Sequence, residues 1–397
     1  MVSSGEFMTK SSNHLIRVAN IVEEGRIGGP QIRIALIASA LNSKKIHTTV
    51  IFPKKDSRDF QKLCKKNGIS YLMTPITTLR RDLVTIFLYI ISFPFEVLML
   101  SKILKKNRYD VLHLSGGSWQ YKGLFAAKLA GVKVIWHLND TYTPVFIRGI
   151  FSLVSYFANS FIYASYRTKK YYEKLIPNKN KNFLIQSPVD INFFNPDINF
   201  KVKKFYKKIN LKNKIVIGTV ANVNPVKGLE TFLKAAVEIS SNKKDVIFLI
   251  IGSVHHNQRK YYTYLINIIK ENKLKNVFFI NSRKDIRPLL KIFDIYVCSS
   301  NNESSPMSVW EAMSMKKAIV STDVGDVKNF IINKVNGFIV KVGDHEALAK
   351  RVVTLIKTPK LRYIFGKLVR NIAKNKLDLK VCVNLHINAY KKTIKHD

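Results

Sequence analysis

Residues 301–325 of the chain read NNESSPMSVWEAMSMKKAIVSTDVG, and this stretch decides the fold. The apolar run Ile295–Ser299 precedes it and predicts a strand. Pro306 stands where a helix begins, which is the position at which proline is best tolerated. Glu303 is therefore expected on a loop at the carboxyl end of the strand. Glu311, eight positions later, is expected about a turn and a half into the helix.

The helix that begins near Pro306 offers a binding end. The backbone amides from Ser305 to Ser308 lie in its first turn, where amides lack intrahelical partners. Such an end attracts anions and polar ligand oxygens, and a sugar that carries a diphosphate offers both. The plain alternative is a capping carboxylate plus a solvated helix glutamate, because charged helix residues mostly face water.

The remainder of the chain shows the alternation of an α/β protein. Its 397 residues are too many for one ordinary core, so we expect two domains. Two series of short apolar runs alternate with helical patterns, which is typical of parallel sheets. The boundary is expected near residues 188–214. The predicted strands are 15–22, 47–52, 69–72, 111–114, 132–136, 161–163 and 182–186, then 215–220, 246–252, 277–280, 295–299, 318–321 and 337–340.

Residues 301–325 resemble the E-x7-E region of the retaining glycosyltransferases of family 4, and residues 186–196, QSPVDINFFNP, resemble the linker of that family. The resemblance implies the α/β fold called GT-B. In this fold two Rossmann-like parallel-sheet domains face each other across a cleft, and a C-terminal helix crosses back to the first domain. It implies an acceptor-side domain, 1–195 with the helix 375–397, and a nucleotide-sugar-binding domain, 196–374.

The resemblance also assigns the donor side. In the family the first glutamate and the amides after it hold the donor sugar, and the second glutamate hydrogen-bonds the ribose, which implies these roles for Glu303 and Glu311. Residues 220–228, VANVNPVKG, resemble the phosphate clamp of the family, in which Lys227 matches the lysine that grips the diphosphate. Asn222 stands where many members have arginine, so one fixed cation is missing and a weaker grip is expected. The remaining residues implied to hold the donor are Ser305, Pro306, Met307, Ser308 and Arg283.

Two further motifs belong to the first domain. Residues 23–30, EEGRIGGP, resemble the family's glycine loop, which implies that Gly28 and Gly29 lie against the donor diphosphate; paired glycines alone would more often mark a plain turn. By resemblance His137 faces the reacting carbon, although a lone histidine at a strand end is usually structural. Glu303, His137 and Lys227 are thus expected to carry catalysis. Acceptor-side candidates are Asp140, His113 and Ser115.

Charge is the second strong feature of the sequence. The chain has 66 Lys+Arg and 26 Asp+Glu, a formal net charge of +40, which favours anionic partners. Acidic substrates and an anionic membrane surface are both expected partners. Nucleic acid is disfavoured, because the aromatic and basic platforms of such modules are absent. The most apolar segment, 83–101, contains Pro94 and Glu96, so we expect a core helix or an interfacial helix rather than a span.

The resemblance therefore implies a retaining glycosyltransferase that moves a sugar from a nucleotide-sugar to a glycan or lipid-linked acceptor, in cell-envelope polysaccharide or lipopolysaccharide synthesis. We expect no metal and no other cofactor, since no Asp-x-Asp stands at a strand end. Cys64, Cys298 and Cys382 lack the spacing of a zinc site or a disulfide framework. The expected location is cytoplasmic or peripheral on the inner face of the cytoplasmic membrane.

Two alternatives remain open on the sequence alone. One is a sugar-nucleotide epimerase or hydrolase on the same scaffold, and the other is a non-catalytic protein that binds polyanions. The first fourteen residues, MVSSGEFMTKSSNH, are polar and do not resemble a signal peptide. The sequence does not distinguish whether residues 1–7, before Met8, are native or an expression-derived extension.

Overall fold

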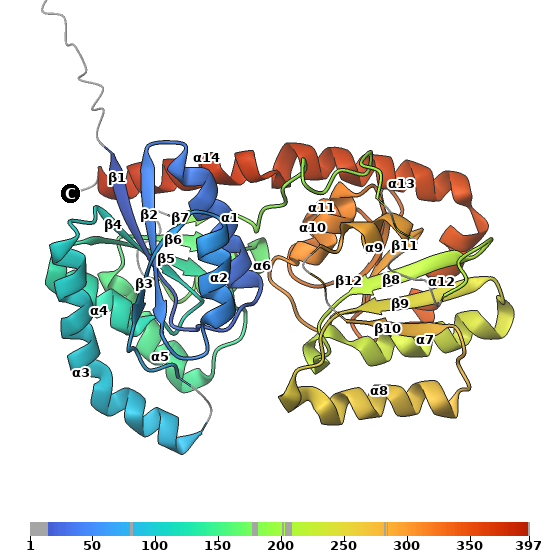
Figure 1. The fold of residues 1–397 in the computed structure, drawn as a ribbon, viewed down its shortest axis with the longest axis horizontal. Helices are drawn as coiled ribbons and strands as arrows, with labels where there is room; N and C mark the ends of the chain where they lie inside the picture. Colours follow the sequence, from blue (N-terminus) through green and yellow to red (C-terminus); the bar gives the residue numbers. More distant parts are fainter. Residues whose placement is uncertain are drawn as a thin grey trace, which may run out of the picture. The chain divides into compact units, whose positions relative to one another are not determined.

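The computed structural model describes residues 15–79, 82–176, 182–200, 202, 209–281, 283 and 285–395 (Figure 1). The chain forms two compact units. The first consists of Met1–Trp136, Phe157–Ser160 and Ile387–Asp397, and the second of His137–Tyr156 and Phe161–His386. The amino-terminal segment discussed above lies outside the described residues.

The first sheet has the strand order β3-β2-β1-β4-β5-β6-β7, and β1 pairs in parallel with both β2 and β4. The chain therefore reverses its direction of travel across the sheet between β1 and β4, where ligands of such folds usually bind. The strands are β1 Ile16–Ile21, β2 Ile46–Pro53, β3 Ser70–Thr74, β4 Val111–Ser115, β5 Lys133–Leu138, β6 Ser160–Tyr163 and β7 Asn182–Leu184. The helices are α1 Gly29–Asn42, α2 Arg58–Lys66, α3 Leu83–Lys106, α4 Tyr121–Ala130, α5 Val145–Val154, η1 Ser155–Phe157 and α6 Tyr166–Tyr172.

The second sheet has the order β10-β9-β8-β11-β12-β13, and β8 pairs in parallel with both β9 and β11. Its strands are β8 Ile215–Val220, β9 Val246–Ile251, β10 Val277–Ile280, β11 Ile295–Cys298, β12 Ala318–Thr322 and β13 Phe338–Val340. Its helices are η3 Pro225–Lys227, α7 Leu229–Asn242, η4 His256–Gln258, α8 Arg259–Glu271, α9 Arg287–Ile292, α10 Met307–Ser314, α11 Val327–Phe330, α12 His345–Lys357 and α13 Pro359–Ile372, followed by the π-helix η5 Ala373–Leu377 and α14 Leu379–Ile394.

The predicted order of strands is confirmed. Each predicted strand is present, with ends that differ by no more than two residues. The reason is visible in β9, whose side chains alternate between two cores. Phe248 and Ile250 pack into the cluster beneath α7 and α12, while Leu249 and Ile251 pack with Trp310 of α10. A strand buried on both faces reads as a continuous apolar run, and such a run is easy to recognise.

Of the two alternatives for residues 83–101, the core helix is wrong, and the interfacial helix stays a prediction. Of the most apolar 18-residue window of α3, only 22% is buried, and its mean hydropathy is 2.2. Among the described residues α3 is the one helix long and apolar enough, by length and composition, to cross a membrane. Its exposed apolar side chains are Leu83, Val84, Ile86, Phe87, Leu88, Ile90, Ile91, Phe95 and Leu98.

The last helix, α14, begins in the second unit and ends in the first. In the second unit, Leu379 at its start donates its backbone N–H to the carbonyl of Val189 in the linker. In the first unit, Tyr390 is buried and its hydroxyl hydrogen-bonds His113 Nδ1 at 2.7 Å, while Thr393 hydrogen-bonds Ser160 at 2.6 Å. The expected C-terminal helix that returns to the first domain is thus present.

Gly252 should be intolerant of a side chain, because a Cβ there would lie 2.0 Å from the carbonyl oxygen of Ala221. Backbone cannot rotate away as a side chain can, so the ends of β8 and β9 would have to separate. We expect Gly252→Ala to lower the free energy of unfolding by about 1–3 kcal/mol. Gly149→Ala in α5 is the matched control, since nothing lies within 4 Å of its Cβ position. Urea unfolding followed by circular dichroism measures both, and equal midpoints would contradict the packing argument.

Candidate active site

The loops that follow β8 and β11 meet at the point where the second sheet changes direction. Lys227 closes η3 in the first loop, and Glu303 stands in the second. Lys227 Nζ lies 2.6 Å from Glu303 Oε1, and the hydroxyl of Ser300 donates to the same oxygen at 2.9 Å. The structure therefore brings together the two residues expected to contact the donor diphosphate and the donor sugar.

Local capping explains why the Lys227 loop takes this path. The side chain of Asn224 accepts a hydrogen bond from the backbone N–H of Val226, at 2.9 Å. Gly228 then adopts a left-handed φ of 56°, and a Cβ there would lie 2.2 Å from the carbonyl oxygen of Ser299. Asn222 is exposed, and its amide oxygen accepts the N–H of Ser253 at 3.0 Å, so part of its side chain joins the ends of β8 and β9.

The electrostatics of Lys227 favour a fixed cation. Burial alone would lower the pKa of its amine, but the charge and the hydrogen bond of Glu303 outweigh burial and raise that pKa above its usual value. The ammonium is thus held charged in a half-buried position, with 28% of its side chain exposed. A cation of this kind can stabilise negative charge that appears on a ligand without first reorganising water.

The helix α10 begins as predicted, with Pro306 in the N-cap position. Ser305 is engaged already, since its hydroxyl accepts the indole N–H of buried Trp310 at 3.1 Å and the backbone N–H of Ser187 at 2.9 Å. Met307 and Ser308 are half-buried in the first turn. Burial raises the pKa of the Glu311 carboxyl to about 8.

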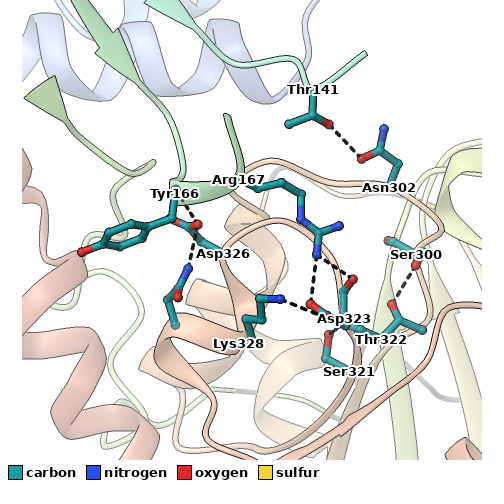
Figure 2. Close-up of polar contacts among 11 residues, drawn as sticks. Thr141, Tyr166, Arg167, Ser300, Asn302, Ser321, Thr322, Asp323, Asp326 and Lys328 are labelled. Carbon is teal, nitrogen blue, oxygen red and sulfur yellow. Dashed lines mark hydrogen bonds and ion pairs between the residues drawn. The ribbon is translucent and has the colours of Figure 1, made fainter. Parts of the chain in front are cut away.

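The sequence reasoning missed Asp326, which joins α6 to the loop that carries Ser304. Figure 2 shows Asp326 hydrogen-bonded to Tyr166. Asp326 is fully buried, and its carboxylate accepts the backbone N–H of Tyr166 at 2.7 Å, the side chain of Gln186 at 2.9 Å and the side chain of Asn329 at 3.0 Å. Its own N–H donates to the carbonyl of Ser304 at 3.0 Å. Burial raises the pKa of this carboxyl, and the hydrogen bonds only partly oppose that rise.

A second set of polar contacts joins α6 to the same loops. Arg167 Nη2 lies 3.0 Å from Asp323 Oδ1, and Lys328 Nζ lies 3.3 Å from the other oxygen of Asp323. The hydroxyls of Thr168 and Ser304 hydrogen-bond at 2.9 Å. Figure 2 shows Arg167 reaching from α6 to Asp323. The Arg167–Asp323 contact links residues 156 positions apart and the Thr168–Ser304 contact links residues 136 positions apart, so no local sequence pattern predicts them.

The remaining predicted site residues have the following surroundings. His137 is fully buried, with its ring 6.2 Å from that of His386, and Asp140 accepts a hydrogen bond from Tyr172 at 2.7 Å. Arg283 is exposed. In the first unit, His113 and Ser115 are buried in β4. Gly28 caps α1 in an extended conformation, and nothing lies within 4 Å of a Cβ on Gly29, so the loop leaves open space there.

A buried polar cluster at the end of β1 was also missed. Glu23 follows β1 and accepts the hydroxyl of Tyr89 at 3.3 Å, and burial raises the pKa of its carboxyl to about 7. Lys122 Nζ lies 3.7 Å from the centre of the Tyr89 ring and 2.6 Å from Glu96 Oε2. The cluster ties the inner face of α3 to the glycine loop. Among the described residues, no three His, Cys, Asp or Glu side chains gather where they could hold a metal ion.

Comparisons with known proteins give matches to two family models and to named relatives. Two family models match the chain, Glycosyl transferases group 1 over residues 201–372 and Glycosyltransferase Family 4 over residues 27–193. The Campylobacter jejuni N,N'-diacetylbacillosaminyl-diphospho-undecaprenol alpha-1,3-N-acetylgalactosaminyltransferase is 26% identical over 76% of this chain and 83% of its own length. The Escherichia coli UDP-Gal:alpha-D-GlcNAc-diphosphoundecaprenol alpha-1,3-galactosyltransferase is 25% identical over 79% of this chain and 84% of its own.

The fold has solved counterparts. The crystal structure of Anabaena HepE, in complex with UDP and glucose, superposes with a TM-score of 0.80 over 95% of this chain and 99% of its own. The two sequences are 18% identical, so the likeness shows the two-domain fold.

The raised pKa of Glu311 predicts a pH-dependent stability. Its carboxyl moves from an ordinary 4.5 to about 8 on folding, so the folded protein holds this proton more tightly than the unfolded chain. The associated stability is present below about pH 4.5 and is lost as pH rises through about 8. Relative to Glu311→Gln, the wild type should lose roughly 5 °C of melting temperature between about pH 5 and about pH 9.

The exposed Glu346 in α12 supplies the matched control for this pH series, since its carboxylate already lies in water. Calorimetric melting of the wild type, Glu311→Gln and Glu346→Gln across the range makes the comparison. Parallel curves for the wild type and Glu311→Gln would show that the Glu311 carboxyl is not buried in the folded protein.

Proposed function

Because the chain belongs to the group 1 glycosyltransferases, we propose that it transfers a sugar from a nucleotide-sugar donor to a lipid-linked glycan acceptor in cell-envelope synthesis, with retention of configuration. The observation that carries this proposal is the Lys227–Glu303 pair at the direction change of the second sheet. That position is where ligands bind in open parallel sheets.

Each donor residue has a role that its surroundings support. As the bond between the sugar and the diphosphate breaks, negative charge grows on the departing diphosphate, and the fixed ammonium of Lys227 stabilises it. Glu303, held by Ser300, is placed to accept hydrogen bonds from sugar hydroxyls. Glu311 supplies a carboxyl for the ribose hydroxyls. The ligand can thereby be held at three points without a metal ion.

The acceptor class is proposed from the relatives. The Campylobacter and Escherichia relatives are named for acceptors built on diphospho-undecaprenol, and both match more than three quarters of this chain. A lipid-linked acceptor requires that the enzyme work at a membrane surface. The net charge of +40 suits such a surface when the lipid is anionic.

The helix α3 is the proposed lipid contact. Its outer face is apolar and exposed, and the lysines at its end, Lys102, Lys105 and Lys106, are exposed as well. Its inner face carries Glu96, which is paired with Lys122 inside the protein, so that face cannot turn to lipid. A helix of this kind lies in the interface with its apolar side about 5–10 Å deep. We therefore propose a peripheral location on the inner face of the cytoplasmic membrane.

The transferase proposal predicts a large effect of Glu303→Gln. We expect transfer to fall by about 100-fold or more, because the sugar loses a charged partner while the fold is unchanged. The assay offers UDP-, GDP- and ADP-sugars, with and without a lipid–glycan extract, and follows nucleotide release and the sugar product. Glu346→Gln is the control and should transfer normally. A folded Glu303→Gln protein with an unchanged transfer rate would refute the assignment, and free or epimerised sugar at full rate without extract would favour the hydrolase or epimerase alternative.

The membrane proposal predicts that α3 governs vesicle binding. Combined Phe87→Gln, Ile90→Gln and Phe95→Gln should weaken flotation with phosphatidylglycerol vesicles at least tenfold, because each buried apolar side chain contributes about 1.5–3 kcal/mol. Combined Ile332→Gln, Val335→Gln and Tyr363→Gln, which alter exposed apolar residues of the second unit, should bind like the wild type. Equal flotation of the two triple variants would remove α3 as the lipid contact.

A further inference from the structure

A hollow of about 430 Å³ lies in the second unit beside the Glu303 loop, and the donor assignment does not use it. It is formed by the loop after β5, by α6 and by the loop after β11. The lining residues are Thr141, Tyr142, Arg167, Lys170, Tyr171 and Asn302. Two of these lining residues, Thr141 and Asn302, hydrogen-bond to each other at 3.4 Å (Figure 2).

The wall contributed by α6 is cationic because of helix periodicity. Arg167, Lys170 and Tyr171 stand at positions i, i+3 and i+4, which share one face of a helix. The neighbouring Lys169 lies off that face and is paired with Glu173 at 3.4 Å. Lys170 is exposed and makes no ion pair with a described residue. Helix periodicity therefore places Lys170 at the hollow and the preceding residue, Lys169, away from it.

The charged residues that line the hollow are both cations, Arg167 and Lys170. Arg167 donates through Nη2 to Asp323, and Lys328 contacts the same carboxylate, so one anion is shared by two cations before Lys170 is added. Phenol, hydroxyl and amide groups of Tyr142, Thr141 and Asn302 add neutral hydrogen-bonding groups. Such a set suits a compact, multiply charged oxyanion better than a neutral sugar.

The position of the hollow selects which anion it can take. Asn302 directly precedes Glu303, and consecutive Cα atoms lie about 3.8 Å apart. A ligand in the hollow is thus next to the proposed sugar contact, but on the α6 side. The donor diphosphate is assigned to Lys227, so it does not need these cations.

We propose that this hollow binds the diphosphate that joins an acceptor sugar to its lipid carrier. The inference rests on the proposed function, and it names the part of the acceptor that the enzyme recognises. With the diphosphate on Arg167 and Lys170, the first acceptor sugar lies beside Glu303. The tyrosine Tyr171 keeps the wall in place, since its hydroxyl accepts the backbone N–H of Thr143 at 3.0 Å.

The test compares two adjacent lysines with one probe. Geranyl diphosphate supplies the lipid diphosphate without any sugar, and geranyl monophosphate supplies a smaller charge. Lys170→Gln should weaken geranyl diphosphate binding about tenfold in calorimetric titration, because a charge-assisted contact is lost. Lys169→Gln removes the same charge from the same helix outside the hollow, and it should change the affinity less than twofold. The effect of Lys170→Gln should be smaller for the monophosphate.

The donor and the acceptor diphosphate are told apart by adding UDP. The proposal expects UDP to bind both lysine variants like the wild type and to leave geranyl diphosphate bound. Displacement of geranyl diphosphate by UDP, or equal losses in the two variants, would overturn the proposal.

The binding test of the hollow can fail without contradicting the proposed transferase function. A protein that transfers sugar but shows no difference between the two variants would lack the acceptor site and keep the proposed function. A protein that neither binds a nucleotide nor transfers sugar would lose the proposed function itself.

Discussion

The arrangement of the site depends on one buried carboxylate. The carboxylate of Asp326 accepts hydrogen bonds from the first backbone N–H of α6 and from the side chains of Gln186 and Asn329. The backbone N–H of Asp326 donates to the carbonyl of Ser304. A buried carboxylate is costly unless its oxygens are satisfied, so these contacts are strongly specified. Gly325, beside it, takes a left-handed φ of 50° and lets its backbone come close to Ser304. The Glu303 loop and α6 are therefore fixed to the same point.

The Lys227–Glu303 pair adds an electrostatic constraint. In the absence of a donor each charge is the partner of the other, at 2.6 Å, so neither is left uncompensated in a half-buried place. Under the proposed donor assignment, an arriving diphosphate must share the ammonium with Glu303, and sugar hydroxyls must share the carboxylate with Lys227. Binding the diphosphate and the sugar together compensates both charges when the Lys227–Glu303 ion pair is broken. Binding only one of them leaves either Lys227 or Glu303 half-buried without a partner, which is unfavourable. The pair thereby favours an intact nucleotide-sugar over free sugar.

The sequence predicted the strands, but it did not predict the contacts between residues that are far apart in the chain. Strands such as β9 are buried on both faces and announce themselves as apolar runs. Lys227 and Glu303 could be named because each lies in a short motif after a strand. Asp326 carries no such mark, since its partner Tyr166 is 160 positions away. For α3, composition cannot distinguish an apolar helix that packs into a core from one whose apolar face is exposed, and only the structure shows that this face is exposed.

The two faces of α3 connect the proposed membrane contact to the glycine loop. Its inner face holds Tyr89, which donates to Glu23 directly after β1, and Glu96, which is paired with Lys122. Because these contacts are buried and charged, breaking them is expensive, so α3 cannot move independently of the end of β1. If the outer face rests in lipid, the loop that carries Gly28 and Gly29 is held at a fixed height above the membrane surface. The glycine loop would then keep a constant distance from the lipid that carries the proposed acceptor.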